Sequence, residues 1–393
     1  MGIPHTYRGR RMMQKSPATE TADTFEILRQ AGLRPPKMLT VSITAACNLT
    51  CRHCWVEAES ASSSLHVPGK ALHRLIGEYK ELGGEGVRIT GGEPLSHPAW
   101  LDLLRFACGL GFGSVAMQTN AILFKDKDVA ALQGLNCPGL SLQISLDGAT
   151  AATHDLVRGD GAFQGVMQGI RRLSEGGLSR HISLFFTEMR HNLEEIPGLL
   201  ELADSFGITT VATGALVLCG RAGNESLVAP PGQDQYGTLL HRYETDPRFR
   251  DLYDEIGNTA ALEWLKGDAP RTECCTFVEN PYLTPGGDLY PCVLCHADGF
   301  AVTGVFAKSL AAAFAEGAPL WSALLKTSRR RSDAIQECRD CPGQSDCAGG
   351  CMGRAWGSRG DLLAADDRCE LRRSIYQKKN SRHHHKQGHK AEH

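Results

Sequence analysis

The sequence has no long apolar run and no excess of charge of one sign, and its cysteines are unevenly distributed. No stretch approaches the roughly 20 continuous apolar residues that a membrane-spanning helix needs, and the basic start of the chain runs into polar sequence instead of an apolar export segment. We therefore expect a cytoplasmic protein with no membrane partner. With 42 Lys and Arg against 44 Asp and Glu, the net charge is −2, which gives no basic field to attract a nucleic acid.

Cysteine is abundant but clustered, with 15 residues in a chain of 393. Disulfides do not persist in a reducing compartment, so grouped thiols there indicate metal ligation. One group comprises Cys47, Cys51 and Cys54, and the other comprises Cys274, Cys275, Cys292, Cys338, Cys341, Cys347, Cys351 and Cys369, with Cys295 nearby. The scattered Cys108, Cys137 and Cys219 are expected to behave as small buried apolar side chains, with Cys219 also a candidate for lining a cavity.

Short β-rich runs alternate with amphipathic stretches from residue 38 onward. The runs cover 38–44, 86–90, 114–119, 140–146, 182–187 and 210–218, and helical patterns fall between them, including 72–82, 100–110, 163–173 and 193–206. Six strand-then-helix units in series predict a parallel α/β sheet with right-handed crossovers. In such sheets the functional groups gather at the carboxyl ends of the strands.

Composition divides the chain into five parts. We predict an N-terminal extension (1–37), the α/β region (38–228), a mixed helical linker (229–270), a cysteine-rich region (271–375) and a basic, His-rich tail (376–393). The cysteine-rich region has few long periodic runs, as expected where metal ligation substitutes for a core. The composition of the tail predicts disorder.

The first cysteine group follows directly on the first predicted strand. Three thiolates can hold a cuboidal four-iron cluster by three corners, which leaves the fourth iron open to a substrate or cofactor. The alternative is a zinc site with His53 as the fourth ligand, but the spacing of Cys47, Cys51 and Cys54 matches no common zinc motif.

The string Cys-x3-Cys-x2-Cys, followed here by Trp55, resembles the cluster-binding loop of the radical S-adenosylmethionine (SAM) superfamily. That resemblance implies a partial (β/α)6 barrel, a [4Fe-4S] cluster whose open iron chelates SAM, and reductive cleavage of SAM to a 5′-deoxyadenosyl radical. The motif Gly91-Gly92-Glu93-Pro94 after the second strand is similar to the GGEP motif of the same family. Glycines there allow close backbone approach, and the Glu93 carboxylate is expected to accept a hydrogen bond from the SAM ammonium group.

Later strand ends carry further expected cofactor contacts. Asn120 closes the third strand, and Ser145 and Asp147 close the fourth. Because Ser145 and Asp147 leave the strand on the same side, both are expected to face the cofactor. Arg158 resembles the arginine that reaches the SAM carboxylate in the family, and Arg221 after the sixth strand is a weaker candidate for the same site.

The second cysteine group resembles the SPASM extension, a small cysteine-rich domain that holds two auxiliary [4Fe-4S] clusters in some radical SAM enzymes. By that resemblance Cys338, Cys341, Cys347 and Cys369 would bind the outer cluster. The inner cluster would take Cys292 and Cys351 together with one or both of Cys274 and Cys275. Two thiols stand there where the family pattern has one, and Cys295 is a further candidate, so the inner ligand set stays open. A pair of structural zinc sites is the alternative.

The resemblance implies an oxidoreductase that modifies a peptide or protein, with a flavodoxin or ferredoxin as reductant. Since the 37 residues before the first strand are few, a leader peptide would need either a separate leader-peptide-binding protein or the SPASM surface. Modification of a tetrapyrrole side chain is a second possibility. A non-catalytic iron-sulfur electron carrier is a third, although a carrier has no use for a SAM pocket.

Overall fold

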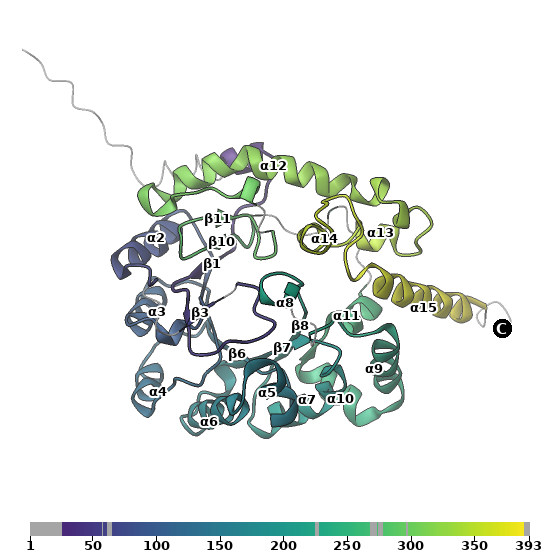
Figure 1. Ribbon diagram of the computed structural model, residues 1–393, viewed down its shortest axis with the longest axis horizontal. Coiled ribbons are helices and arrows are strands. Elements are labelled where there is room, and N and C mark those ends of the chain that lie inside the picture. The colour runs from purple at the N-terminus through teal and green to yellow at the C-terminus, as the bar shows by residue number, and fades with distance from the viewer. Residues whose placement is uncertain are drawn as a thin grey trace, which may run out of the picture.

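A curved nine-stranded sheet forms the centre of the molecule (Figure 1). The computed structural model describes residues 26–56, 58–60, 65–224, 228–267, 273, 278–295 and 298–388. The strand order is β11-β10-β1-β4-β5-β6-β7-β8-β9, and every neighbouring pair is parallel except β10 and β11. The strands are β1 (Met38–Ser42), β4 (Gly86–Thr90), β5 (Ser114–Thr119), β6 (Leu140–Ser145), β7 (Ile182–Glu188), β8 (Val211–Ala215), β9 (Gly257–Asn258), β10 (Tyr282–Leu283) and β11 (Leu289–Tyr290).

The α/β class and the six predicted strands are confirmed, since β1 and β4 to β8 fall within one to three residues of the expected bounds. The alternation of buried and partly buried residues along β4 shows why its sequence predicted a strand. Val87 and Ile89 are fully buried on one face, while Arg88 and Thr90 on the other face are only partly buried. Thr90 lines a cavity inside the curved sheet, so the alternate residues of β4 face that interior.

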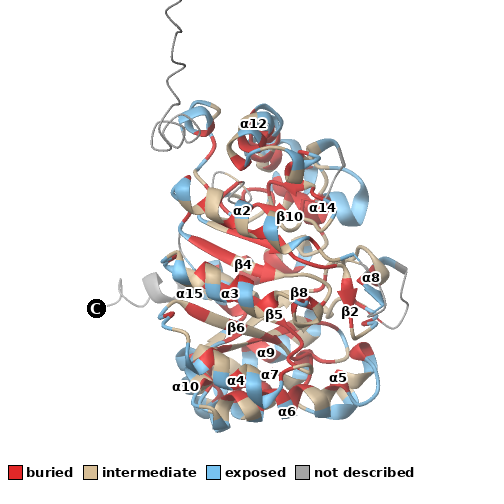
Figure 2. Ribbon diagram, turned by 90° about the vertical axis from the view of Figure 1, so that its left-hand side faces the viewer, coloured by how far each residue is buried: buried red, intermediate tan, exposed pale blue. Residues whose placement is uncertain are grey.

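Helices cover the outer face of the sheet. Figure 1 shows α2 to α7 in an arc around it, with bounds α2 (Gly69–Glu81), α3 (Trp100–Gly109), α4 (Asp126–Gln133), α5 (Ala151–Arg158), α6 (Ala162–Glu175) and α7 (Ile196–Ser205). The predicted face of α2 is buried, with Leu72, Leu75, Ile76 and Tyr79 inaccessible to solvent. Figure 2 shows the resulting pattern, in which buried strands lie behind helices that are exposed on their outer side. Burial of these apolar faces supplies the main stabilisation of the barrel.

The predicted linker is packed against the barrel. It forms α9 (Gln233–Thr245), α10 (Pro247–Ile256), β9 and α11 (Ala260–Lys266), preceded by the short helix α8 (Arg221–Asn224). Tyr236, Phe249 and Tyr253 belong to the same apolar core as the six main strands. The segment is therefore part of the folded core, as an extension of the α/β region.

The cysteine-rich region differs from expectation in two ways. Its strands β10 and β11 extend the barrel sheet beyond β1. The sequence did not predict them, because a strand of two residues is too short to show an alternating pattern. It also contains the 25-residue helix α12 (Leu310–Ala334), although few long periodic runs were expected. Pro319 inside α12 obscures the helical pattern, because proline is normally a helix breaker. The remaining helices are α13 (Gln344–Cys347), α14 (Met352–Arg359) and α15 (Cys369–Gly388).

The helix α15 runs through residues 376–388, over which the tail was predicted to be disordered. Leu371, Ile375 and Tyr376 are buried, so tertiary packing supports the first part of this helix. Residues 389–393 lie outside the described residues. None of the described helices combines the length and apolar character needed to cross a membrane.

Two of the scattered cysteines also differ from expectation. Cys108 and Cys137 are paired as a disulfide, with their Cα atoms 5.4 Å apart, where two separate thiols were predicted. Cys108 follows the buried stretch of α3 and Cys137 precedes β6. Because these segments are 29 residues apart in sequence, only the folded chain brings the two sulfurs together.

Candidate active site

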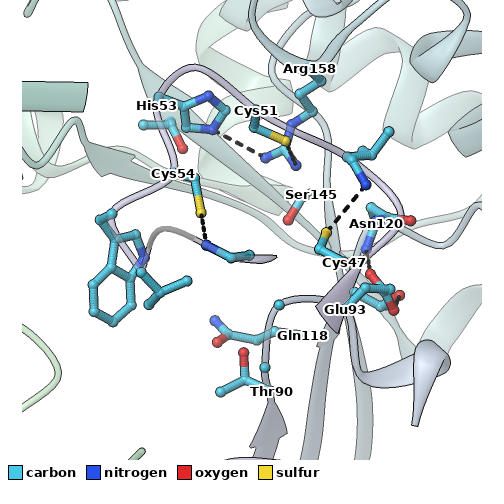
Figure 3. A pocket seen from close by; sticks show the side chains of 18 of the residues that line it. Cys47, Cys51, His53, Cys54, Thr90, Glu93, Gln118, Asn120, Ser145 and Arg158 are labelled. Carbon is cyan, nitrogen blue, oxygen red and sulfur yellow. Dashed lines mark hydrogen bonds between the residues drawn. The ribbon is translucent and has the colours of Figure 1, made fainter. Parts of the chain in front are cut away.

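One cavity at the carboxyl ends of the barrel strands collects the first cysteine group. Cys47, in the short strand β2 (Ala46–Cys47), and Cys51 and Cys54, in the loop before β3 (Glu59–Ser60), all line it (Figure 3). The amide N–H of Leu49 donates to Cys47 Sγ at 3.4 Å, and that of Ala58 donates to Cys54 Sγ at 3.5 Å. Backbone donors to sulfur stabilise thiolates and tune iron-sulfur clusters.

Arg221, the first residue of α8 after strand β8, holds this loop in place. Its Nε donates to the carbonyl oxygen of Cys51 and its Nη1 to that of Ala58, both at 2.9 Å. Its Nη2 is buried and has no hydrogen-bond partner within the part of the chain that the structure describes. The preceding Gly220 has φ +58°, and a Cβ there would lie 2.7 Å from the carbonyl oxygen of Cys54. The loop is thus clamped by backbone contacts and retains one unused buried donor beside the thiols.

The thiols themselves are poorly solvated. Burial raises the pKa of Cys47 to about 12. Burial also raises the pKa of Cys51, although the positive charge of Arg158 opposes the rise. Thiolates form in such surroundings only when a positive centre compensates for the lost hydration. The donor set therefore fits a metal cluster that binds all three sulfurs.

The Gly91-Gly92-Glu93 segment packs directly against the cluster loop. A Cβ on Gly91 would lie 2.7 Å from the carbonyl oxygen of Thr44, and one on Gly92 would lie 2.5 Å from that of Ala46. The N–H of Glu93 donates to the same Ala46 oxygen at 2.8 Å. The glycines are therefore needed for contact between two backbones, in addition to the predicted approach of a ligand.

The Glu93 carboxylate is buried and already accepts three hydrogen bonds from protein. Oε1 accepts from the Leu95 N–H at 3.0 Å and from Thr119 Oγ1 at 2.6 Å, and Oε2 accepts from the Asn120 N–H at 2.8 Å. Burial nevertheless raises its pKa to about 6. Since a carboxylate offers about four acceptor positions, capacity remains for one cationic donor from the cavity.

Polar side chains from the next two strands complete the lining. Asn120 lines the cavity beside the cluster loop, where its Nδ2 donates to Asn48 Oδ1 at 2.8 Å. Ser145 at the end of β6 also lines it. One layer deeper, Gln118 Nε2 donates to Gln143 Oε1. Sequence reasoning missed Gln143, although its alternation with Ser145 in β6 places both on the interior face.

Asp147 is placed differently from its prediction. It is fully buried and absent from the cavity lining, because Arg158 Nε donates to its Oδ2 at 2.6 Å and the Thr187 N–H donates to its Oδ1 at 2.7 Å. His53 Nε2 lies 3.1 Å from the same Oδ2. Asp147 lies beyond Ser145, the last residue of β6. The alternation of side chains along a strand therefore does not determine where the Asp147 side chain points.

Arg158 does line the cavity, but it faces the thiols. Its Nη1 lies 4.0 Å from Cys51 Sγ, and its Nη2 lies 3.5 Å from His53 Nε2 (Figure 3). The Asp147 carboxylate raises the pKa of Arg158 against the effect of burial. The guanidinium is thus held as a permanent cation next to the cluster loop.

A second cavity collects four cysteines of the C-terminal region. Cys338, Cys341, Cys347 and Cys369 line it together with Arg372 and Arg373. Their segments are the turn after α12, the helix α13 and the first residue of α15. The four are the residues that the sequence grouped for an outer cluster, and the fold brings them to one place.

Only part of the ligand set expected for an inner cluster falls within the described residues. Cys274 and Cys275 lie outside the described residues. The Cys351 N–H donates to Asp366 Oδ2 at 2.6 Å, and Cys292 Sγ accepts from the Leu294 N–H at 3.4 Å. Cys295 is buried in the apolar core.

Across the residues that the structure describes, no three His, Cys, Asp or Glu side chains are placed to hold a single metal ion. Trp55 contacts Tyr282 of β10 with ring centroids 5.7 Å apart, and both line the first cavity. Sequence reasoning missed Tyr282, because only the fold brings the cysteine-rich region to the barrel edge.

Comparison with known proteins agrees with this geometry. The family model described as the radical SAM superfamily matches residues 41–203. The mycofactocin maturase MftC of Mycobacterium ulcerans is 30% identical over 351 residues, which cover 86% of this chain and 89% of that protein. An AdoMet-dependent heme synthase of Methanosarcina barkeri is 31% identical over 207 residues, covering 52% of this chain and 57% of that protein. The solved structure "Native anSMEcpe with bound AdoMet" shares the fold, with a TM-score of 0.69 at 15% identity, covering 88% of this chain and 98% of that one.

Proposed function

Because this chain belongs to the radical SAM superfamily, we propose that it is a peptide or protein maturase that abstracts a hydrogen atom from its substrate with a 5′-deoxyadenosyl radical. It is an enzyme of SAM radical chemistry, with a [4Fe-4S] cluster and SAM as the cofactors of its family. The observation that carries the proposal is the cavity lined jointly by the three cysteines of one loop, the Gly91-Gly92-Glu93 segment and the ends of β5 and β6.

In this proposal Cys47, Cys51 and Cys54 bind the catalytic cluster by three of its irons. When bound, that cluster supplies the electron that cleaves SAM. The rest of the work belongs to the chain itself, where Arg221 fixes the loop backbone and Arg158 keeps a positive charge beside Cys51. Both arginines act as positioning residues, since their hydrogen bonds go to the loop and to Asp147.

The SAM contacts are proposed for Trp55, Gly91, Gly92, Glu93, Asn120 and Ser145, which all line the cavity. Glu93 has room for the ammonium group because its carboxylate has an unused acceptor position. Asp147 is assigned a positioning role beneath Arg158, since its carboxylate is occupied by protein donors. The polar pair Gln118 and Gln143 lies deeper in the barrel, where the substrate carbon must come to rest.

Two auxiliary clusters complete the proposal. Cys338, Cys341, Cys347 and Cys369 would hold the outer one in the second cavity. Cys292 and Cys351, with Cys274 or Cys275, would hold the inner one. A flavodoxin or ferredoxin would deliver the electron, a separate protein would present the leader peptide, and the cytoplasm would supply the reducing conditions.

The maturase proposal rests on the 30% identical relative, which covers most of both chains. The heme synthase similarity favours a second candidate, modification of a tetrapyrrole side chain. Anaerobic incubation with any short candidate peptide encoded by a neighbouring open reading frame, and in parallel with a haem precursor, distinguishes them by mass spectrometry. A loss of hydrogen atoms from the peptide alone supports the maturase, and a mass change in the tetrapyrrole alone supports the second candidate.

The SAM reaction has its own test. Protein reconstituted with iron and sulfide, then given SAM and dithionite, should form 5′-deoxyadenosine. The triple variant Cys47→Ala, Cys51→Ala, Cys54→Ala is the matched control and should form none. Equal amounts from both proteins would contradict the assignment and favour a non-catalytic electron carrier.

A further inference from the structure

Arg331 in the last turn of α12 is an arginine with an unusual environment. Its side chain is completely buried. Its Nη2 donates to the carbonyl oxygen of Gly349 at 2.7 Å and to that of Ala364 at 2.9 Å. Its Nε and Nη1 are buried and have no hydrogen-bond partner among the described residues.

A buried guanidinium such as that of Arg331 requires a compensating negative charge. Moving a charge out of water is costly unless an opposite charge or a full set of hydrogen bonds compensates for the lost hydration. No carboxylate of the described residues forms an ion pair with Arg331; its partners there are carbonyl oxygens. The negative end of the α12 dipole helps, but a helix terminus carries only about half a charge.

The four cysteines of the second cavity lie next to this arginine. Gly349, whose carbonyl oxygen accepts from Arg331, lines that cavity, as does Ala365, the neighbour of Ala364. A Cβ on Gly349 would lie 2.7 Å from the Cβ of Arg331, so the two backbones are in contact.

The other buried arginine at the cavity has a carboxylate of its own. Arg372 Nη2 donates to Asp366 Oδ1, and Asp366 also accepts the N–H of Cys351 at 2.6 Å. This pair is close to neutral, and it connects the second cavity to a residue proposed for the inner cluster. Arg331 is therefore a buried positive charge beside the cavity that no carboxylate of the described residues compensates.

We propose that Arg331 is the counter-charge of the outer auxiliary cluster and raises its reduction potential, so that this cluster is the electron-accepting end of the auxiliary pair. The proposal rests on the proposed function, which puts a four-thiolate cluster in that cavity. Such a cluster is an anion, and the addition of one electron makes it more negative. A fixed cation in a poorly solvated site stabilises the reduced form more than the oxidised form.

Potentiometric titration of the reconstituted enzyme with dithionite, followed by electron paramagnetic resonance, tests this. The variant Arg331→Gln removes the charge and keeps a donor for the carbonyl oxygens. We expect the equilibrium constant for reduction of the outer cluster to fall at least tenfold, which is a shift of about 59 mV to lower potential for a one-electron couple. Arg331→Lys, which keeps the charge, should recover most of the shift.

The matched control is Arg330→Gln. Arg330 is the preceding residue of the same helix and is exposed, so the same change in net charge occurs in water, where it is screened. Its effect should be well under a tenfold change. Equal potentials for wild type and Arg331→Gln, or an equal shift for Arg330→Gln, would overturn the proposal.

Iron content separates this result from failure of the proposed function. The variant with Cys338, Cys341, Cys347 and Cys369 all changed to Ala should lose about four irons per chain. Unchanged iron there would mean that no outer cluster exists, and the proposed function would fail with it. If that cluster exists but both Arg331→Gln and Arg331→Lys lose it, Arg331 serves assembly and its role in the potential is refuted.

Discussion

Asp147 and Ser145 stand two residues apart at the end of one strand, and their side chains have different surroundings. Ser145 lines the first cavity, whereas Asp147 is enclosed by Arg158, the Thr187 N–H and the side chain of Asn192, whose Nδ2 donates to the Asp147 carbonyl oxygen at 3.0 Å. At this scale, the function of a polar residue depends on which donors the fold brings to it. A buried carboxylate surrounded by protein donors supports the residues that line the site.

His154 belongs to the same buried group and predicts a pH dependence. Its Nδ1 accepts the Asp147 N–H at 3.0 Å, and burial lowers its pKa to about 4. An unfolded histidine has a pKa of about 6.5, so the neutral ring stabilises the fold fully above that pH. The contribution falls as the pH drops from about 6.5 toward 4, since the unfolded state then binds the extra proton.

Between about pH 7.5 and 5.5 the free energy of unfolding should therefore fall by about 1 kcal/mol through His154 alone. Urea denaturation of the wild type and of His154→Asn at the two pH values measures this. The variant should lose that part of the pH dependence, whereas His241→Asn, which alters an exposed histidine on α9, should keep it. An equal pH dependence in all three proteins would contradict the assignment.

At the scale of elements, the cluster loop and the Gly91-Gly92-Glu93 turn form one unit. The two segments are about 45 residues apart in sequence, yet their backbones are in van der Waals contact through two glycines. The contact forms because the two motifs follow the neighbouring strands β1 and β4. Each turn supports the conformation of the other.

Gly92→Ala tests that contact. Its new Cβ would lie 2.5 and 2.6 Å from the carbonyl oxygens of Ala46 and Ala45, so one backbone must move. We expect a loss of about 1–3 kcal/mol in the free energy of unfolding and a lower iron content. Gly109→Ala in α3 is the control, because a Cβ there meets no atom within 4 Å; it should be neutral or slightly stabilising. Full iron content and stability in Gly92→Ala would refute the contact.

At the scale of the whole molecule, an ion pair and hydrogen bonds from arginine side chains join the cysteine-rich region to the barrel. Arg354 of α14 pairs with Asp367, with Nε 2.8 Å from Oδ1, and donates to the carbonyl oxygens of Ala215 and Leu216 at the end of β8. Arg368 pairs with Glu188 of β7 at 3.0 Å. These contacts fix the second cavity relative to the first.

Arg354→Gln should lower the free energy of unfolding by about 3–5 kcal/mol, because it leaves the Asp367 carboxylate buried without its cation. Guanidinium denaturation measures the change. The control is Arg359→Gln, at the exposed end of the same helix, which should change stability by less than about 0.5 kcal/mol. A similar small effect for both variants would show that Arg354 does not join the two regions.

The sequence by itself determined the α/β class, the six main strands and the two cysteine groups that line the two cavities. It did so because strand alternation, helical spacing and clustered cysteines are local patterns, and because parallel strands bring their ends to one edge. The packing of the predicted helical linker against the barrel, the strands β10 and β11 and the helix α15 were decided by tertiary contacts, which give short or polar segments a structure that their own composition does not indicate.

Side-chain direction was decided by the tertiary structure as well. The disulfide between Cys108 and Cys137 and the enclosure of Asp147 both join segments that are distant in sequence, and no local pattern encodes such a meeting. The same holds for Arg331, which reads in sequence as the last of three consecutive arginines on a helix. Only the fold distinguishes it from Arg330, because burial without a carboxylate is a property of position in three dimensions.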